Sequence, residues 1–475
     1  MSRPLSRSEL EAGDAELAAS LVMRGRAAMM EIENAGQTVL DQAVTALAWS
    51  HYRPENAREL AETAVRDTGL GNITDKIEKI RRKTFGALRD LSRVKSTGVI
   101  EEIPERGLVK FAKPVGVVAA ICPSTNPAST AVNKAMMAIK GGNAIVLAPS
   151  PLGWTATARS AALMREELAR TGKPVDLVQV IPQPVVKSRT EALMAACDLV
   201  VATGSSDSVR RAYKSGKPAI GVGTGNVPVI IDSSADLKDA ARKIAASKTF
   251  DNGTSCAAEN AVIILDDVYR PAVQALVAEG GYLADEIEKH SIAAKFWTGG
   301  QLSRDLIARN ADAFARACAL GPKAEQARFF MVEETGVGPG FPFSGEKLSL
   351  VLAVYRAENF DQAVALARAI LDFQGKGHSC GIHTKDMTHA RELAAKAEAV
   401  RVLVNQSHAF GGGGGFDNGL NFTLSQGCGT WSGNSISENL NYRHFLNITH
   451  LSVPIPEDRP AEEDLFGDYW ERFGR

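Results

Sequence analysis

The chain contains no apolar segment long enough to span a membrane and no pair of cysteines spaced to hold a metal ion. Within its 475 residues no window approaches an uninterrupted apolar run of about 20 residues. The N-terminus, MSRPLSRSELEAGD, lacks the apolar core of a signal peptide. The six cysteines are scattered without CxxC spacing, which argues against a zinc site and against a disulfide framework. We therefore expect a cytoplasmic protein with no membrane partner and no metal.

The chain also lacks an excess of either charge. Its 54 Lys and Arg residues balance 55 Asp and Glu residues, and the net charge of -1 gives no general attraction for nucleic acid. A hydrophobic content of 45% and a charged content of 23% are typical of a soluble globular protein. The length exceeds one ordinary core, so we expect two or three domains that act on small molecules.

The first ninety residues carry a helical pattern without a sustained heptad. The predicted helices are Glu9–Met30, Gly36–His51, Pro54–Thr68 and Ile73–Leu91. Short alternating segments follow over Val99–Phe111, which predicts a hairpin with its turn near Pro104–Gly107. We expect a helical layer followed by a small β element.

Beyond Pro114 the pattern alternates between continuous apolar runs and amphipathic helices, which is typical of parallel strands buried on both faces. The runs predicted as one doubly wound sheet are Val115–Ile121, Ala144–Ala148, Leu177–Ile181, Leu199–Ala202 and Val227–Ile231. A second α/β unit follows Asp232, and its predicted strands are Ala261–Leu265, Ser349–Tyr355, Gly381–His383 and Arg401–Val404. The sequence therefore predicts an α/β protein with a Rossmann-type cofactor domain.

Cys256 lies between a loop rich in Gly, Asn, Asp and Ser and a buried apolar strand. Such a loop can present a thiol to a substrate, and neighbouring backbone N–H groups can stabilise both a thiolate and an oxyanion. The alternative is a small buried apolar cysteine. Asn126, in the turn after the first sheet strand, could donate its amide to the same oxyanion, unless it only forms an Asx-turn before Pro127.

Thr203, Gly204 and Ser205 separate a buried strand from a helix, an arrangement that offers free N–H groups to a pyrophosphate. The glycines of Gly221–Asn226 run instead into a strand, so they favour a close backbone approach beside Cys256 over a phosphate loop. We expect Gly223 and Pro149 to contact the cofactor. His378 and His408 could be catalytic or could be satisfied core histidines.

Together these stretches resemble the aldehyde dehydrogenase superfamily, and within it the CoA-acylating branch that includes the aldehyde dehydrogenase half of bifunctional alcohol/aldehyde dehydrogenases. The likeness is collinear from about Pro114 to Asn439, in GVVAAICPSTNP, GGNAIVLAPSP, VATGSSDSVRRA, GVGTGNVPVIID, FDNGTSCAAEN, EKLSLVLAVYR and GCGTWSGNSISENL. It implies a cofactor domain over 1–98 and 113–231, a catalytic domain over 232–434, and an oligomerisation flap over 99–112 with a tail over 435–475. A homodimer or homotetramer is implied as well.

The resemblance implies that Cys256 is the nucleophile, Asn126 the oxyanion donor, and Thr203 to Ser205 the pyrophosphate turn. It places Glu346 near the nicotinamide ribose. Hydrolytic members have an ELGGK motif, whose glutamate is the general base, where this chain has GVGTGN, and they have a lysine in place of Ala148. The choice between NAD and NADP therefore stays open.

The missing glutamate has a chemical consequence. Water must be deprotonated to attack a thioester, whereas a thiol such as CoA is already a strong nucleophile near neutral pH. The sequence thus favours NAD(P)-dependent oxidation of a short aldehyde with acyl transfer to CoA, with His378 as a candidate base for the CoA thiol. A non-acylating aldehyde dehydrogenase that releases a free acid is the alternative.

The segment from Arg401 to Arg443 resembles acylating enzymes that act on sulfoacetaldehyde or succinate semialdehyde. Arg401, Arg443 or His408 could pair with the sulfonate or carboxylate of such a substrate. We expect sulfoacetaldehyde, with succinate semialdehyde as the alternative, and the sequence leaves the direction of the reversible reaction open.

Overall fold

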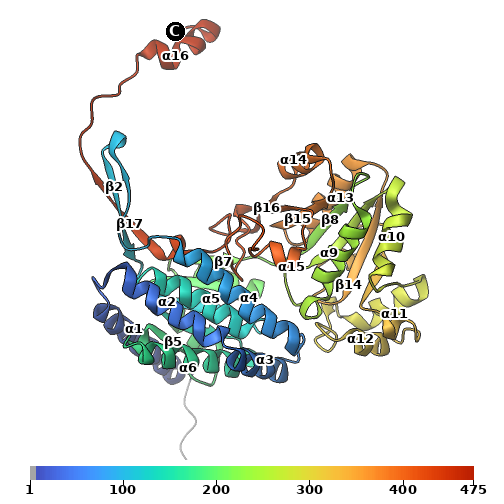
Figure 1. Ribbon diagram of the computed structural model, residues 1–475, viewed down its shortest axis with the longest axis horizontal. Helices are drawn as coiled ribbons and strands as arrows, with labels where there is room; N and C mark the ends of the chain where they lie inside the picture. The colour runs from blue at the N-terminus through green and yellow to red at the C-terminus, as the bar shows by residue number, and fades with distance from the viewer. Residues whose placement is uncertain (1–6) are drawn as a thin grey trace, which may run out of the picture.

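Two α/β halves and a projecting β flap make up the chain (Figure 1). The computed structural model describes residues 7–475, with side chains described from residue 11 onward. No helix in this described part is both long and apolar enough to cross a membrane.

The first half is built on a five-stranded parallel sheet in the order β5-β4-β3-β6-β7. Its strands are β3 (Val117–Cys122), β4 (Ala144–Pro149), β5 (Val178–Val180), β6 (Leu199–Thr203) and β7 (Ala219–Val222). The chain winds outward from β3 in one direction and from β6 in the other. The switch between β3 and β6 opens a crevice at their carboxyl ends, where ligands bind in doubly wound sheets.

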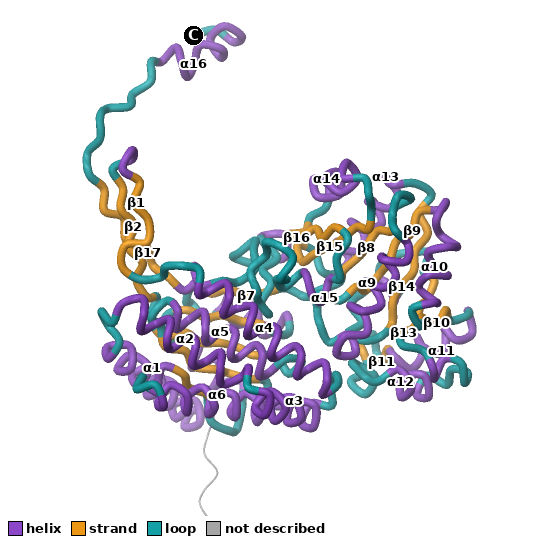
Figure 2. Tube along the Cα trace, in the orientation of Figure 1, coloured by secondary structure: helices purple, strands orange, loops and turns teal. Residues whose placement is uncertain are grey.

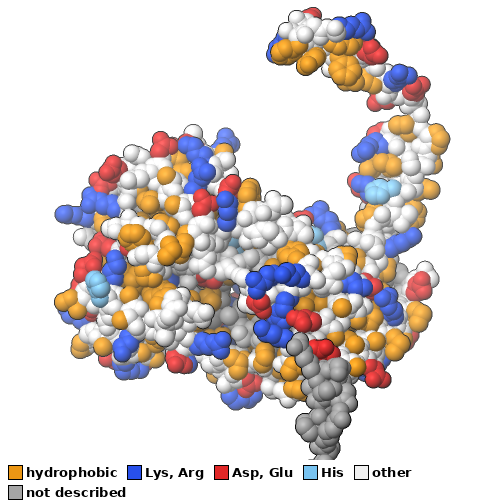
Figure 3. All heavy atoms as spheres, turned by 180° about the vertical axis from the view of Figure 1, so that it is seen from behind, with side chains coloured by type: hydrophobic (Ala, Val, Ile, Leu, Met, Phe, Trp, Pro, Cys, Tyr) orange, Lys and Arg blue, Asp and Glu red, His pale blue; other side chains and the backbone are white. Residues whose placement is uncertain are grey.

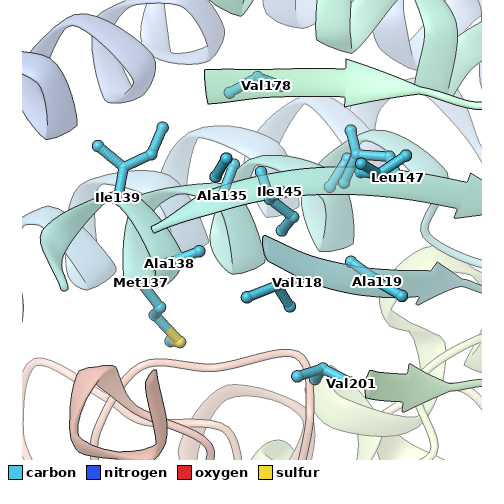
Figure 4. Close-up of a cluster of buried hydrophobic side chains, with 14 of the residues drawn as sticks. Val118, Ala119, Ala135, Met137, Ala138, Ile139, Ile145, Leu147, Val178 and Val201 are labelled. Atoms are coloured by element: carbon cyan, nitrogen blue, oxygen red, sulfur yellow. The ribbon is translucent and has the colours of Figure 1, made fainter. Parts of the chain in front are cut away.

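Eight helices of the described residues belong to this half. They are α1 (Arg7–Glu31), α2 (Gly36–Tyr52), α3 (Pro54–Thr68), α4 (Ile73–Ser92), α5 (Pro127–Lys140), α6 (Trp154–Arg170), α7 (Lys187–Ala196) and α8 (Ser206–Lys214). Helix α5 is buried along its whole length. Its Ile139 and Met137 pack with Val118 of β3 and Ile145 of β4 in the core that Figure 4 shows. The helical N-terminal layer is confirmed, and both ends of each of its four helices lie within two residues of the prediction.

The second half is built on a seven-stranded parallel sheet in the order β10-β13-β14-β9-β8-β15-β16. Its strands are β8 (Val227–Ile231), β9 (Glu259–Leu265), β10 (Gly281–Leu283), β13 (Phe329–Glu333), β14 (Val351–Ala357), β15 (Gly377–His383) and β16 (Ala399–Val404). Its helices are α9 (Leu237–Thr249), α10 (Tyr269–Ala278), α11 (Glu286–Phe296), α12 (Ala311–Ala317), α13 (Phe360–Phe373), α14 (Met387–Lys396) and α15 (His408–Gly411). A short ribbon joins β11 (Trp297–Thr298) to β12 (Gln301–Leu302).

The assignment of Val227–Ile231 to the first sheet was wrong. This strand, β8, pairs with β9 and β15 in the second sheet, while the unpredicted strand β7 completes the first. A buried apolar run shows that a strand is covered on both faces but not which neighbours it pairs with. The crossover between the sheets therefore lies at Gly223–Asn226, and the two halves meet there.

The predicted hairpin is confirmed as β1 (Gly98–Ile103) and β2 (Leu108–Pro114), and the C-terminal strand β17 (Leu446–Ser452) pairs with β2. Figure 2 shows this three-stranded flap standing away from the body. Helix α16 (Glu462–Phe473) follows it, and no residue of α16 is buried. Apolar side chains along the flap and α16 are visible in Figure 3.

We expect opposite stability changes from two glycine substitutions in helices. A Cβ at Gly86 of α4 would lie 2.3 Å from the ring of Phe422, whereas one at Gly13 of α1 meets nothing within 4 Å. Gly13→Ala should therefore raise the free energy of unfolding by about 0.5–1 kcal/mol. Gly86→Ala should lower it by about 1–3 kcal/mol, because the buried ring must move. Urea unfolding followed by circular dichroism measures both, and equal stabilisation by the two changes would contradict the packing described for α4.

Candidate active site

Cys256 follows a backbone turn of unusual conformation between α9 and β9. Asp251, Asn252 and Gly253 have φ values of 51°, 53° and 73°, in the left-handed region that favours glycine. Two consecutive non-glycine residues keep this conformation only where other contacts hold it. A buried cluster of charges supplies those contacts.

The carboxylate of Asp251 is fully buried and binds two ammonium groups from α4. Lys76 Nζ lies 3.0 Å and Lys79 Nζ 2.5 Å from Asp251 Oδ2, while Thr254 Oγ1 donates to the same oxygen at 2.6 Å. Burial opposes ionisation of Asp251, yet the two lysines hold the pKa of its carboxyl below the usual value. The cluster thus fixes the loop that carries Cys256 to helix α4.

Lys79 also orients the side chain of Asn126. Its Nζ lies 3.0 Å from Asn126 Oδ1. Because an ammonium group can only donate, the atom facing it must be the amide oxygen, and the amide NH₂ is directed away from Lys79. Asn126 precedes α5 but makes no capping hydrogen bond, so the Asx-turn alternative does not account for it. The NH₂ group remains able to donate to a ligand.

The backbone approaches Cys256 closely from the crossover segment. A Cβ at Gly225 would lie 1.9 Å from the carbonyl oxygen of Cys256. This confirms the close approach predicted for the glycines of Gly221–Asn226. In the described part of the chain no protein group accepts a hydrogen bond from the Cys256 N–H. That N–H and the Asn126 amide are the donors an oxyanion at this position would need.

A cavity of about 680 Å³ lies between the carboxyl ends of the first sheet's strands and the amino ends of β8, β9 and β15. All nine residues predicted for the site line it: Asn126, Pro149, Thr203, Gly204, Ser205, Gly223, Cys256, Glu346 and His378. Its volume is in the range of cofactor and drug-sized ligand sites. The structure therefore brings the predicted residues together, although it does not test their roles.

The far end of the cavity suits a dinucleotide. Ser205 caps α8 by accepting from the N–H of Ser208, and Thr203 Oγ1 bonds to Ser425, so the turn between β6 and α8 is held with its helix N-terminus toward the cavity. Arg211 lines the same end and forms ion pairs with Asp207 and Glu191. The free N–H groups at the start of α8 fit the phosphate oxygens of NAD or NADP.

Glu346 lies between the two ends of the cavity. Its carboxylate accepts from the backbone N–H of Gly225, but burial raises the pKa of Glu346 to about 8. Burial therefore favours the neutral carboxyl group, which can donate a hydrogen bond as well as accept one.

The strand predicted over Gly381–His383 begins earlier, at Gly377, so His378 is the second residue of β15. Its Nδ1 lies 2.8 Å from Ser379 Oγ, and its buried Nε2 has no protein partner. Burial, with the nearby charge of Arg401, holds the pKa of His378 well below its usual value. The imidazole is thus neutral, and its unpartnered Nε2 is buried among the described residues.

Comparison with known proteins agrees with this geometry. A model of the aldehyde dehydrogenase family matches residues 11–286. The acylating sulfoacetaldehyde dehydrogenase of Cupriavidus necator is 50% identical over 97% of this chain and 94% of its own length. The acetylating succinate-semialdehyde dehydrogenase of Clostridium kluyveri is 35% identical over 94% of this chain and 98% of its own. The chain belongs to the aldehyde dehydrogenase family. The crystal structure of an acetylating aldehyde dehydrogenase from Geobacillus thermoglucosidasius, 35% identical, superposes with a TM-score of 0.91 and covers 95% of this chain and 99% of that one.

Three residues considered for a substrate anion in this family member lie elsewhere. Arg401 donates to the carbonyl oxygens of His378 and Gly427, so it braces the walls of the site. Arg443 is exposed and pairs with Glu438, and the buried His408 bonds to the backbone of β15. None of the three lines a cavity beside Cys256.

Sequence reasoning missed the basic face of α4. Lys76, Lys79, Arg82 and Lys83 recur at helical spacing, which was visible in the sequence. A charged stripe on a helix normally faces solvent, and nothing in the pattern shows that this one packs inward. The partner that turns it inward, Asp251, lies 172 residues from Lys79.

We expect alkylation of Cys256 in the unliganded aldehyde dehydrogenase to rise steadily into the alkaline range. Burial, together with the nearby carboxyl of Glu346, raises the pKa of the thiol to about 12. Only the thiolate reacts, so its rate with iodoacetamide should grow about tenfold per pH unit from about pH 7 to 10. Mass spectrometry of the modified peptide, with Cys256→Ala as control, measures it. A plateau between about pH 8 and 9 would show instead that the site stabilises the resting thiolate.

Proposed function

We propose that the protein is a CoA-acylating aldehyde dehydrogenase, which oxidises a short aldehyde with NAD or NADP and passes the acyl group from Cys256 to CoA. The names of its relatives support the acylating activity. The observation that carries the proposal is that the cavity offers water no unpaired, ionised carboxylate as a base. Among the described residues that line it, only Asp207 and Glu346 carry carboxyl groups; Asp207 is paired with Arg210 and Arg211 on α8, and burial favours the neutral form of Glu346 by raising its pKa to about 8.

In the first half-reaction the Cys256 thiolate adds to the aldehyde carbonyl. The oxyanion that forms is held by the amide NH₂ of Asn126 and the N–H of Cys256. Lys79 and Asp251 position these donors by tying the Asn126 turn and the cysteine loop to α4. When bound, the nicotinamide cofactor supplies the hydride acceptor for the oxidation, and Thr203 to Ser205 and Glu346 would hold it.

In the second half-reaction the CoA thiol displaces the acyl group from Cys256. The proposed acceptor of the proton of that thiol is His378, which lines the cavity in its neutral form, although its lowered pKa makes it a weak base. Water lacks a comparable advantage, because it is a far weaker acid than a thiol and needs a stronger base. Acyl transfer is therefore favoured over hydrolysis. Each step is reversible, so the enzyme can also reduce an acyl-CoA.

We further propose sulfoacetaldehyde as the substrate, with succinate semialdehyde as the alternative, because the relatives named for these aldehydes align over almost the whole chain.

The exposed apolar residues of the flap support a role in joining subunits into a homodimer or homotetramer. A cytoplasmic location is part of the same proposal.

The acylating activity predicts that NAD(P)H forms from sulfoacetaldehyde in steady state only when CoA is present. Without CoA we expect at most one equivalent per active site, because the Cys256 thioester then accumulates. Absorbance at 340 nm over a panel of aldehydes, with and without CoA, measures this. CoA-independent oxidation at an undiminished rate would refute the acylating assignment, and turnover by Cys256→Ala would refute the mechanism.

Two variants should separate the half-reactions. Asn126→Ala should slow the single-turnover formation of NAD(P)H by about 10²–10³-fold, since it removes one oxyanion donor. His378→Ala should leave that step within about threefold of wild type but slow acyl transfer to CoA by about 10²-fold. Rapid quench of the acyl-enzyme at several pH values distinguishes the two. Unchanged transfer by His378→Ala at every pH would exclude His378 as the base.

A further inference from the structure

A second, small cavity shares Asn126 with the first and borders the cysteine loop at Ser255. Asn126 and Ser255 form its inner wall, and Lys79, Arg82 and Lys83 reach it from α4. Its volume is about 30 Å³, which leaves room for little more than the end of a short chain. Cys256 lines the first cavity and its neighbour Ser255 lines this one, so the two spaces adjoin at the cysteine loop.

The three basic residues stand at positions i, i+3 and i+4 of one helix, so they share one face. Lys79 is neutralised by Asp251. Lys83 donates to the carbonyl oxygen of Gly413 at 2.7 Å, and no carboxylate of the described residues forms an ion pair with it or with Arg82. The cavity therefore holds more positive charge than the protein balances.

Arg82 is held by aromatic rings rather than by anions. Its guanidinium lies over Phe410 of α15 at 5.5 Å and over Phe416 at 5.1 Å from the ring centres. Such contacts occupy the faces of the planar group and leave its N–H donors free at the edge. The Nε of Arg82 is buried and has no hydrogen-bond acceptor. Figure 1 shows α4 and α15 side by side where the two halves meet.

Lys83 is buried next to other cations and lacks a counter-ion among the described residues. Burial, reinforced by the charges of Arg82 and Lys79, lowers the pKa of Lys83 to about 7. An anion bound beside it would offset that repulsion and favour the charged ammonium. A buried cation without a counter-ion raises the free energy of the folded protein, and a bound anion would lower it.

We propose that Arg82, assisted by Lys83, binds the negatively charged end of the aldehyde substrate and selects short aldehydes that carry a sulfonate or carboxylate. This inference rests on the proposed aldehyde oxidation at Cys256, because it assigns the tail of the same substrate. The small volume favours the two-carbon sulfoacetaldehyde over the longer succinate semialdehyde. The proposal assigns binding of the substrate anion to residues that line this cavity, in place of Arg401, Arg443 and His408.

The test compares Arg82→Met with Arg81→Met as a matched control. Arg81 is the preceding residue on α4, but it lies over Tyr52 and lines neither cavity. The measured quantity is the ratio of kcat/KM for sulfoacetaldehyde to kcat/KM for propionaldehyde, with CoA and NAD(P) saturating. Arg82→Met should lower this ratio about 30–100-fold through loss of charge-assisted hydrogen bonds, Arg82→Lys should lower it less, and Arg81→Met should leave it unchanged. Succinate semialdehyde, run in parallel, distinguishes carboxylate from sulfonate recognition.

A binding measurement keeps this inference separate from the proposed activity. Isethionate, a two-carbon sulfonate without an aldehyde, should slow the alkylation of Cys256 in wild type and in Arg81→Met but not in Arg82→Met. A wild type that prefers propionaldehyde, or an unchanged ratio in Arg82→Met, would overturn the anion site while leaving CoA-dependent oxidation intact. Isethionate protection in a protein without CoA-dependent oxidation would refute the proposed function and keep the anion site. If Arg82→Met does not fold, absence of isethionate protection in wild type overturns the inference.

Discussion

The buried contact of Asp251 with Lys76 and Lys79 is the constraint on which the site depends. It joins a helix of the N-terminal layer to the loop of the second half that carries Cys256. Removing one partner of such a cluster leaves an uncompensated buried charge, at a cost of about 3–5 kcal/mol. The contact therefore holds two consecutive residues in the left-handed conformation and sets where the thiol stands relative to the first sheet.

The same contact couples nucleophile and oxyanion donor. Lys79 donates to Asp251, Thr254 and Asn126 at once, so all three of its ammonium hydrogens have acceptors on the two sides of the site. The turn after β3 and the loop before β9 belong to different sheets, and few other features would hold their relative position within the tolerance that catalysis needs. Lys76 adds a parallel link, since its Nζ donates both to Asp251 and to the carbonyl oxygen of Thr125, so two lysines of α4 tie the halves together.

The sequence was sufficient to predict elements whose signals are local. The four N-terminal helices, the hairpin at the flap and the Gly204 turn follow from periodicity, glycine placement and the order of strand and helix. Local residue patterns and the family resemblance together identified nine residues that prove to line one cavity. What could not be predicted depends on long-range pairing: the sheet to which β8 belongs, the strand position of His378, and the inward orientation of α4, which rests on Asp251 far along the chain.

The charges along α4 show how one helix serves two purposes. Lys76 and Lys79 share the carboxylate of Asp251 and stabilise the site, whereas Arg82 and Lys83, one turn later, form no ion pair with a carboxylate of the described residues, at a cost to the stability of the fold. Neutralising the second pair with another buried acid would remove that cost, yet it would also repel an anionic substrate. The imbalance is therefore what a binding site for an anion requires, and the aromatic rings of Phe410 and Phe416 hold Arg82 ready without satisfying it. In this arrangement the turn of α4 that carries Lys76 and Lys79 positions the reacting groups. The turn that carries Arg82 and Lys83 selects the aldehyde substrate by its charge.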